Sequence, residues 1–169
     1  MDIEIEQLTP RSWERYRALR LEALRDAPDA FGSTFESESR RSSEWWRERL
    51  AGDAASFLVK VDGRDAGIAV GAPYPGAEDA GLFAMYVAPR ARGTGASDRL
   101  IEAVIAWARA RRYRRLLLDV GDGNAAAIRL YERHGFVPTG VAGTLPPPRT
   151  HVREHQRALG LTDAPPPRP

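Results

Sequence analysis

A glycine-rich segment with two arginines, Arg90–Ala96, carries the residue types that point most clearly to chemistry. It reads Arg-Ala-Arg-Gly-Thr-Gly-Ala and stands between an apolar run and a long stretch of helical periodicity. Glycines let a backbone approach a ligand closely, and the free N–H groups at the start of a helix attract anions. Arg90 and Arg92 add charges that match phosphate oxygens. The segment therefore predicts a site for a phosphate or diphosphate.

Two common phosphate-binding motifs do not fit this segment. A P-loop requires a lysine directly after its second glycine, and the only lysine of the chain is Lys60. A dinucleotide-binding fingerprint requires a third glycine at the position of Asp98, where a carboxylate does not replace it. The pattern that fits is an arginine, two residues, a glycine, any residue and a glycine, which Arg90, Gly93 and Gly95 match in register.

A second motif, Asn124–Phe136, follows the next apolar run and has the form N-x-x-A-x-x-x-Y-x-x-x-G-F. Tyr131 comes seven residues after Asn124. This is about two helical turns of ~3.6 residues each, so both side chains can lie on one helix face. A phenol with a pKa of ~10 is neutral at pH 7 and can donate a proton to a sulfur anion. The spacing alone nevertheless favours a core aromatic residue beneath Phe136.

Taken together, the two motifs resemble those of the GNAT superfamily of acyl-CoA-dependent N-acetyltransferases. The resemblance is specific over about residues 82–139, and before these only the order of elements agrees. It implies direct transfer of an acetyl group, in a ternary complex, from acetyl-CoA to a primary amine of a small molecule or peptide. Acetyl-CoA would be a co-substrate, and no metal is expected. The alternative is a non-catalytic acyl-CoA-binding regulatory module that has kept the cofactor site.

The resemblance also implies roles for individual residues. The strand before the glycine loop binds the pantetheine arm of the cofactor through main-chain groups, and the next strand diverges from it to leave a slot. Tyr131 is the expected general acid for the departing thiolate. Asn124 either contacts the cofactor or caps its helix. The expected cofactor-binding residues are Met85, Tyr86, Val87, Arg90, Arg92, Gly93, Thr94, Gly95, Ala96 and Asn124.

The general base is less evident. Many relatives carry a glutamate early in the strand before the glycine loop, where this sequence has Gly81. Glu78 is the candidate base, with Asp79 beside it, and Glu36 and Glu38 are further carboxylates near the expected acceptor site. Each of these side chains is better explained as a solvated surface charge than as a catalyst. The identity of the acceptor amine is not encoded in a recognisable motif.

Two other clusters are interpreted as structural. His151, Glu154 and His155 have the order HxxEH, but that metal motif needs a helix and a third ligand, and the alternation here favours a strand. The arginines of Arg109–Arg115 are typical of the solvated end of a helix. A nucleic-acid-binding protein that uses these arginines is a weaker alternative, and we expect no nucleic-acid partner.

The composition limits the classes of protein and of site that this sequence can form. A chain of 169 residues with 43% hydrophobic and 28% charged residues suits one globular domain. The absence of cysteine excludes disulfides, thiolate nucleophiles and cysteine-based metal sites. No apolar run approaches the ~20 residues of a membrane helix, and the acidic N-terminus lacks the order of a secretory signal. We expect a cytoplasmic protein with no membrane partner, and a homodimer is common among similar proteins.

Hydrophobic periodicity predicts the elements that hold these residues. The expected strands are Ile3–Leu8, Ser56–Val61, Gly67–Val70, Leu82–Val87, Leu116–Val120, Phe136–Thr139 and about Val152–Leu159. The expected helices run from Pro10 to before Asp26, from Ser43 for a short distance, over Gly95–Arg112 and over Ala125–His134, and Ala30–Arg41 is expected to be a loop with one helical turn.

This order predicts an α/β (α+β) fold of GNAT type. We expect a mixed, mostly antiparallel central sheet of about seven strands, flanked by about four helices. Residues 1–163 are expected to form a single domain, and the proline-rich segment 164–169 a flexible tail.

Overall fold

Seven segments of the chain form one mixed sheet in the computed structural model, which describes residues 1–162. In the order in which they lie side by side, the strands are β1 (Ile3–Gln7), β2 (Ala55–Val61), β3 (Arg64–Pro73), β4 (Ala80–Val87), β5 (Arg115–Gly121), β7 (Arg153–Gly160) and β6 (Val137–Thr144). Neighbouring strands are antiparallel, except that β4 and β5 run parallel. The expected sheet is confirmed, and the expected tail, 164–169, lies outside the described residues.

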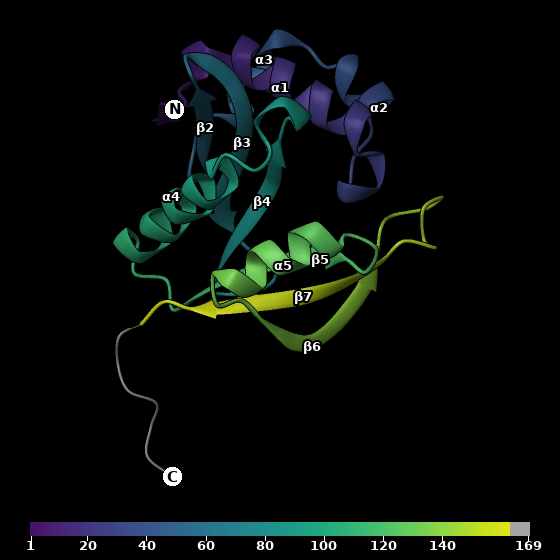
Figure 1. Ribbon diagram of the computed structural model, residues 1–169. Coiled ribbons are helices and arrows are strands. Elements are labelled where there is room, and N and C mark those ends of the chain that lie inside the picture. Colours follow the sequence, from purple (N-terminus) through teal and green to yellow (C-terminus); the bar gives the residue numbers. More distant parts are fainter. Residues whose placement is uncertain (163–169) are drawn as a thin grey trace.

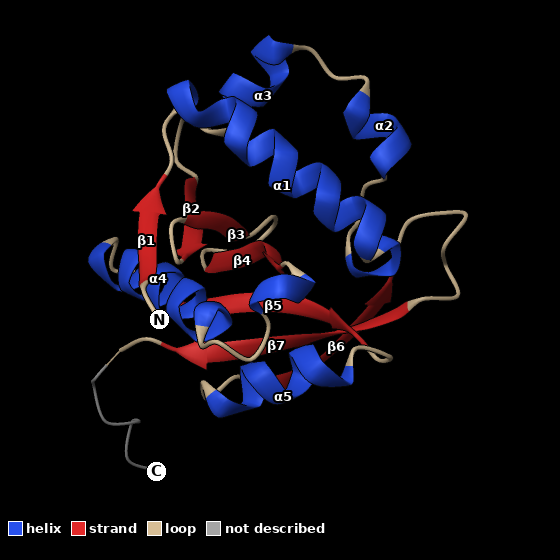
Figure 2. Ribbon diagram, turned by 45° about the horizontal axis from the view of Figure 1, so that its top comes forward, coloured by secondary structure: helices blue, strands red, loops and turns tan. Residues whose placement is uncertain are grey.

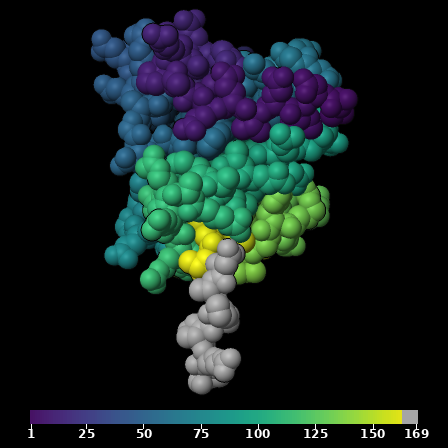
Figure 3. Space-filling view, turned by 90° about the vertical axis from the view of Figure 1, so that its left-hand side faces the viewer, coloured from purple at the N-terminus to yellow at the C-terminus, as the bar shows by residue number. Residues whose placement is uncertain are grey.

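Helices cover both faces of this sheet (Figures 1 and 2). Within residues 1–162 the α-helices are α1 (Trp13–Asp26), α2 (Phe35–Ser39), α3 (Ser43–Arg49), α4 (Ala96–Ala110) and α5 (Ala125–Arg133), and the short 3₁₀ turns are η1 (Pro10–Ser12), η2 (Pro28–Ala30) and η3 (Pro89–Ala91). The space-filling view shows the residues of α4 between the N-terminal segments and the α5–β6 region (Figure 3). None of the helices in the described part is both long enough and apolar enough to cross a bilayer.

Alternation along the central strands produces two separate apolar cores. Leu58 and Ile68 belong to the core beneath α1 and α3, whereas Val59 belongs to the core beneath α4 and α5. Successive side chains of a strand point to opposite faces, so a continuous apolar run such as the one in β2 fills both cores. The largest fully buried side chain is Trp46 of α3, which anchors that helix on the first core.

Strands β3 and β6 differ from the expectation, since β3 spans Arg64–Pro73 where the sequence predicts Gly67–Val70. The expected helical turn within Ala30–Arg41 is the short helix α2, which the Thr34 side chain caps by accepting a hydrogen bond from the Ser37 N–H. Strand β6 continues to Thr144 instead of ending at Thr139. A register shift between Pro138 and Ala142 interrupts the alternation of β6, and most of its side chains are exposed, so periodicity does not reveal the full strand.

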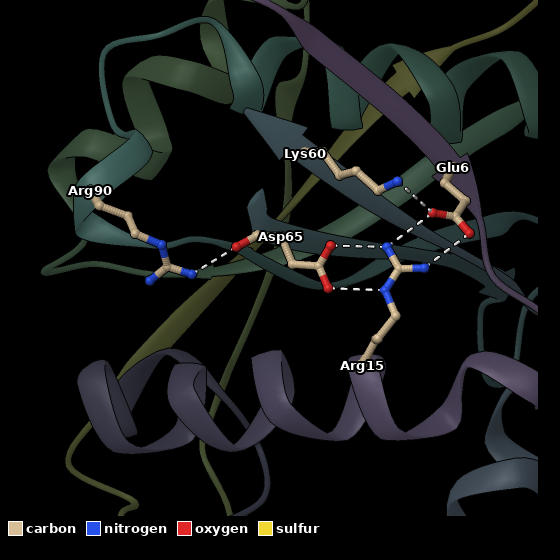
Figure 4. A network of polar contacts seen from close by, with 5 residues as sticks. All are labelled: Glu6, Arg15, Lys60, Asp65 and Arg90. Atoms are coloured by element: carbon tan, nitrogen blue, oxygen red, sulfur yellow. Dashed lines mark hydrogen bonds and ion pairs between the residues drawn. The ribbon is translucent and has the colours of Figure 1, made fainter. Parts of the chain in front are cut away.

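A network of charges fixes α1 to the sheet (Figure 4). Arg15 of α1 donates to both oxygens of Glu6 on β1, at 3.1 and 3.0 Å, and to both oxygens of Asp65 on β3, at 3.0 and 2.9 Å. The hydrogen bonds from Arg15 hold the pKa values of both carboxyl groups below their usual range. The network therefore joins three elements through one guanidinium group.

A second, buried ion pair joins α1 to α2. Arg20 donates from Nε and Nη2 to the two oxygens of Glu38, at 2.9 and 3.0 Å, and their side chains are only 7% and 3% exposed. Burial by itself would raise the pKa of Glu38, but the hydrogen bonds and charge of Arg20 outweigh it and hold the pKa below its usual value. Each of the two buried charges has the other as its counterion in place of water.

We expect Glu38→Gln to lower the free energy of unfolding by about 3–5 kcal/mol at pH 7, because it leaves Arg20 as a buried charge without a counterion. The stabilisation should be present above the unfolded pKa of ~4.3 and disappear as the pH falls through the lower folded pKa, so wild type and variant should converge in acid. Urea denaturation across pH measures both effects. The matched control is Glu36→Gln, whose partner Arg40 forms an exposed pair and which should cost less than about 0.5 kcal/mol.

Candidate active site

The site begins where the two parallel strands of the sheet separate. Strands β4 and β5 pair only at Ala80–Leu116 and Gly81–Leu117, and beyond these pairs they diverge. Figure 1 shows β4 leading away from β5 and β7. A cavity of about 1460 Å³ opens between them, more than the ~300–1,000 Å³ typical of a pocket for one drug-sized ligand. The expected divergence is confirmed, and its size leaves room for a long ligand together with a second one.

Several elements contribute to the walls of this cavity. One wall is residues 82–87 of β4, and the other is residues 119–124, from the end of β5 to the start of α5. The glycine loop and the first turn of α4 lie at the cavity together with one side of α5. The remaining wall is formed by the connection between α1 and α2 and by residues 151–154, which precede and begin β7. The sheet opening is therefore bounded by segments that are far apart in the sequence.

The glycine loop exposes main-chain donors at the start of α4. Gly93 and Gly95 have φ angles of +77° and +93°, a region that favours glycine. The N–H groups of Gly93, Thr94 and Gly95 donate no hydrogen bond to any residue in the range 1–162. The Ala96 N–H is 3.3 Å from Oγ1 of Thr94, whose hydroxyl donates to the Ala91 carbonyl. With the positive end of the 15-residue helix behind them, these donors suit an anion.

The two arginines of the loop point to different places. Arg92 lines the cavity, and it donates to the Val87 carbonyl at 3.2 Å and to Asp26 at 2.9 Å. Arg90 does not line the cavity. It donates to Glu22 and to the main-chain carbonyl of Asp65, the second of which is drawn in Figure 4. Of these two arginines, only Arg92 therefore lies at the cavity, and Arg90 connects the loop to α1 and β3.

A bulge in β4 frees main-chain groups on the wall of the cavity. The register between β3 and β4 shifts near Val70, and Ala84 and Met85 have no partner residue on either neighbouring strand. Ala84 has a φ of +54°, which is unusual for a residue other than glycine. A bulge leaves its extra residue outside the ladder of hydrogen bonds. An alanine in a regular apolar run gives no sequence signal for such a bulge.

Three expected cofactor residues, Met85, Tyr86 and Val87, line the cavity on this strand. The Tyr86 hydroxyl donates to Asp26 at 3.3 Å. Burial, together with the nearby Glu22 and Asp26, raises the pKa of the Tyr86 hydroxyl. Tyr86 is therefore a neutral hydrogen-bond donor that ties β4 to the end of α1.

Tyr131 combines both interpretations that the sequence left open. It is 7% exposed and packs edge-on against Phe136, with ring centroids 5.8 Å apart, as a core residue would. It also lines the cavity, and its hydroxyl has no hydrogen-bond partner within the described residues. Burial raises the pKa of this hydroxyl, so Tyr131 stays protonated over the whole physiological range.

Asn124 also has two roles in the geometry. Its side-chain oxygen accepts a hydrogen bond from the Ala127 N–H at 3.3 Å and caps α5, and the residue lines the cavity as well. Gly135 has a φ of +88° and ends the same helix, as the sequence suggested. The motif therefore sets the start and end of the helix that carries Tyr131.

None of the four carboxylates considered from the sequence lines the cavity. Glu78 is exposed in the turn between β3 and β4 and stays only a prediction as the base. Asp79 pairs with Arg115 at 2.9 Å, and Glu36 and Glu38 pair with Arg40 and Arg20. A side chain at Gly81 would have no space, because its Cβ would come within 2.4 Å of the Phe83 ring.

The structure instead brings other carboxylates to the cavity, among them Asp119 of β5 and Glu154 of β7. Asp119 accepts a hydrogen bond from the Tyr74 hydroxyl at 2.8 Å. In the HxxEH segment, Glu154 lines the cavity while His155 forms a short contact with Asp122. Their positions on a strand explain this separation, since neighbouring side chains point to opposite faces.

Comparisons with known proteins agree with this architecture. The family model described as "Acetyltransferase (GNAT) family" matches residues 16–136. A mycothiol acetyltransferase from Thermobispora bispora is 34% identical over 134 residues, which cover 75% of this chain and 43% of the relative. A GNAT-family acetyltransferase from Streptococcus pneumoniae has a TM-score of 0.78 at 22% identity, covering 95% of this chain and 100% of the other.

A further solved structure has a similar fold. It is a putative acetyltransferase from Salmonella typhimurium with its cofactor acetyl-CoA, and it gives a TM-score of 0.77 at 18% identity over 99% of each chain. The chain spans less than half the length of the curated relatives it matches. The comparisons therefore establish the family and the fold, but they do not identify the acceptor amine.

We expect Gly95→Ala to weaken the binding of coenzyme A by about tenfold, equivalent to ~1.4 kcal/mol. The nearest atom to a new Cβ is 3.8 Å away, so the methyl group fits, but the φ of +93° is unfavourable for alanine and the loop should change shape. Isothermal titration with coenzyme A measures the affinity. The matched control is Gly160→Ala on β7, which has an ordinary φ and open space and should leave the affinity unchanged.

Proposed function

This chain belongs to the GNAT family of acetyltransferases, and we propose that it transfers the acetyl group of acetyl-CoA to a primary amine of a small molecule or peptide. We further propose that the amine attacks the thioester directly while both substrates are bound. The observation that carries the proposal is the single cavity that contains the glycine loop, the bulge of β4 and Tyr131. These are the groups needed to hold a diphosphate, a thioester and a departing thiolate.

The glycine loop and Arg92 would hold the diphosphate of the cofactor. Support comes from the three free N–H groups of Gly93, Thr94 and Gly95 and from the start of α4. A solved structure of the same fold is described with its cofactor acetyl-CoA, which supports acetyl-CoA as the ligand of the cavity. Ala96 and Arg90 would act on the loop itself, the first through its bond to Thr94 and the second through Glu22.

The bulge of β4 would position the thioester. Main-chain groups at Ala84 and Met85 have no β-ladder partner, and such groups can bind the pantetheine arm and donate to the thioester oxygen. A donor aimed at this oxygen stabilises the negative charge that develops there as the amine attacks. The pairs between β3 and β4 on both sides of the bulge, Ile68–Tyr86 and Val70–Phe83, hold the donor in place.

Tyr131 would donate its proton to the sulfur as the carbon–sulfur bond breaks. A buried phenol without a hydrogen-bond partner in the described region is available for this transfer. Asn124 would act chiefly through the helix that it caps, because its side-chain oxygen already accepts the Ala127 N–H.

The acceptor is proposed only as a class. The curated relatives named mycothiol acetyltransferase suggest a mycothiol-related amine as one candidate, and polyamines, aminoglycosides, amino acids and peptide N-termini are others. Release of thiol from acetyl-CoA over such a panel, with mass spectrometry of the products, tests the function. Acetylated product supports an enzyme. Tight binding of coenzyme A without turnover on any amine would instead support the regulatory acyl-CoA-binding module.

For the proton donor, we expect Tyr131→Phe to lower kcat by about 10²-fold while the KM for acetyl-CoA changes less than about threefold. The phenyl ring keeps the contact with Phe136, so only the donor is lost. Steady-state kinetics with the best amine of the panel provide the measurement. Tyr113→Phe is the control, because Tyr113 packs on Trp107 and does not line the cavity. An unchanged kcat for Tyr131→Phe would remove this residue from the mechanism.

A further inference from the structure

We propose that Glu154 of β7 is the group that takes the proton from the acceptor amine, which therefore binds as a cation against this carboxylate. The inference rests on the proposed function and extends it to the acceptor half of the cavity. It rests on three observations, which are the lack of a partner for Glu154, its glycine neighbours in the sheet, and its fixed connection to the helix that carries Tyr131.

Glu154 differs from the other carboxylates of the cavity. Asp98 and Asp122 are engaged by nearby basic side chains, and Asp119 accepts the Tyr74 hydroxyl. Asp29 is exposed. Glu154 is half-buried, lines the cavity and has no hydrogen bond or ion pair within residues 1–162. A partly desolvated carboxylate without a protein partner is the group best able to bind a cation from solution.

The strands on both sides of Glu154 leave its side chain uncovered. Its register partners are Gly121 on β5 and Gly143 on β6. In an antiparallel sheet, the directly opposite residues place their side chains beside each other, and glycine contributes none. The nearest atoms to a Cβ at Gly121 are the Arg153 carbonyl oxygen and Cγ1 of Val152, both 3.9 Å away, so no polar or charged side chain lies within 4 Å of this position. The carboxylate is thus open to the cavity on the β5 side.

Main-chain hydrogen bonds hold Glu154 in a fixed relation to the reacting end of the cavity. The Asp122 N–H donates to the carbonyl of Arg153 at 2.9 Å, directly beside Glu154. The Asn124 N–H donates to the carbonyl of Gly121 at 3.0 Å, and Asn124 caps the helix that carries Tyr131. Proton acceptor and proton donor are therefore set on one rigid β5–α5–β7 unit, as catalysis by two groups requires.

The charges around Glu154 favour a proton acceptor. Burial raises the pKa of its carboxyl group, Asp119 on β5 raises it further, and Arg149 in the β6–β7 loop partly opposes them. On β6, the facing residue Gly143 carries no charge. The guanidinium of Arg149 is itself held by the carbonyls of Pro28, Phe31 and Ser33, and His151 is exposed nearby on the cavity wall. The result is a carboxylate of increased basicity.

In the proposed transfer, an ammonium R–NH₃⁺ gives one proton to the Glu154 carboxylate, and the freed electron pair of nitrogen forms a bond to the thioester carbon. The carbon–sulfur bond breaks with its electron pair on sulfur, which takes the proton of the Tyr131 hydroxyl. The nitrogen of the new amide then gives its second proton to the Tyr131 phenolate, and Glu154 releases its proton to water. The products are the acetylated amine, coenzyme A and one proton.

The test is the pH dependence of kcat/KM for the best amine of the panel, from pH 6 to 10 at saturating acetyl-CoA. In Glu154→Gln we expect a loss of about 10²-fold at pH 7. The loss should shrink toward pH 10, because an alkylamine with a pKa of ~10 is then neutral without help. Glu154→Asp should recover part of the activity. The control Glu102→Gln removes an exposed carboxylate of α4 and should match wild type.

Each contrary result has a distinct meaning. A Glu154→Gln profile equal to wild type, or lower by one constant factor at every pH, overturns the role of Glu154. A pH-dependent loss in Glu78→Gln in its place would assign the proton to Glu78 and would also overturn the proposal. If wild type acetylates no amine of the panel, the proposed function itself fails. Thermal unfolding of each variant shows whether the fold is kept.

Discussion

The separation of β4 from β5 after only two paired residues is the constraint on which the site depends. Parallel neighbours normally continue their ladder, and strands that part leave main-chain groups without partners. Here the core beneath α4 and α5 contains residues of both β4 and β5, and antiparallel strands continue the sheet on either side, so the sheet stays one unit while its centre opens. The cavity thus originates in the sheet, and the neighbouring loops complete its walls.

The two sides of this opening contribute different chemistry. The β4 side supplies main-chain donors, through the bulge at Ala84 and the loop at Gly93 and Gly95. The β5 side supplies side chains, namely Tyr131 on α5 and Glu154 beside β5. Main-chain donors suit the constant parts of a ligand, because they do not depend on side-chain identity. Side chains suit proton transfers, because their pKa values respond to burial and neighbouring charges.

Most charged groups around the cavity are engaged in holding the fold. Arg20 pairs with Glu38, and Arg92 pairs with Asp26. A residue type that suits phosphate or amine chemistry is therefore not by itself a site residue, since the same charge can stabilise a helix contact. What distinguishes Glu154 is that the described structure leaves its charge without a partner while the cavity walls partly remove it from water.

The sequence alone determined the order of the elements, the seven-stranded sheet, the glycine loop at the start of α4 and the helix that carries Tyr131. These features follow from local periodicity and from turn and capping residues, which act over a few positions. Only the tertiary structure decided that Arg92 and not Arg90 reaches the cavity, that β4 has a bulge, and that Glu154 and not Glu78 lines the opening. Those outcomes depend on which distant strand or helix each residue meets, and side-chain type and spacing do not specify such contacts.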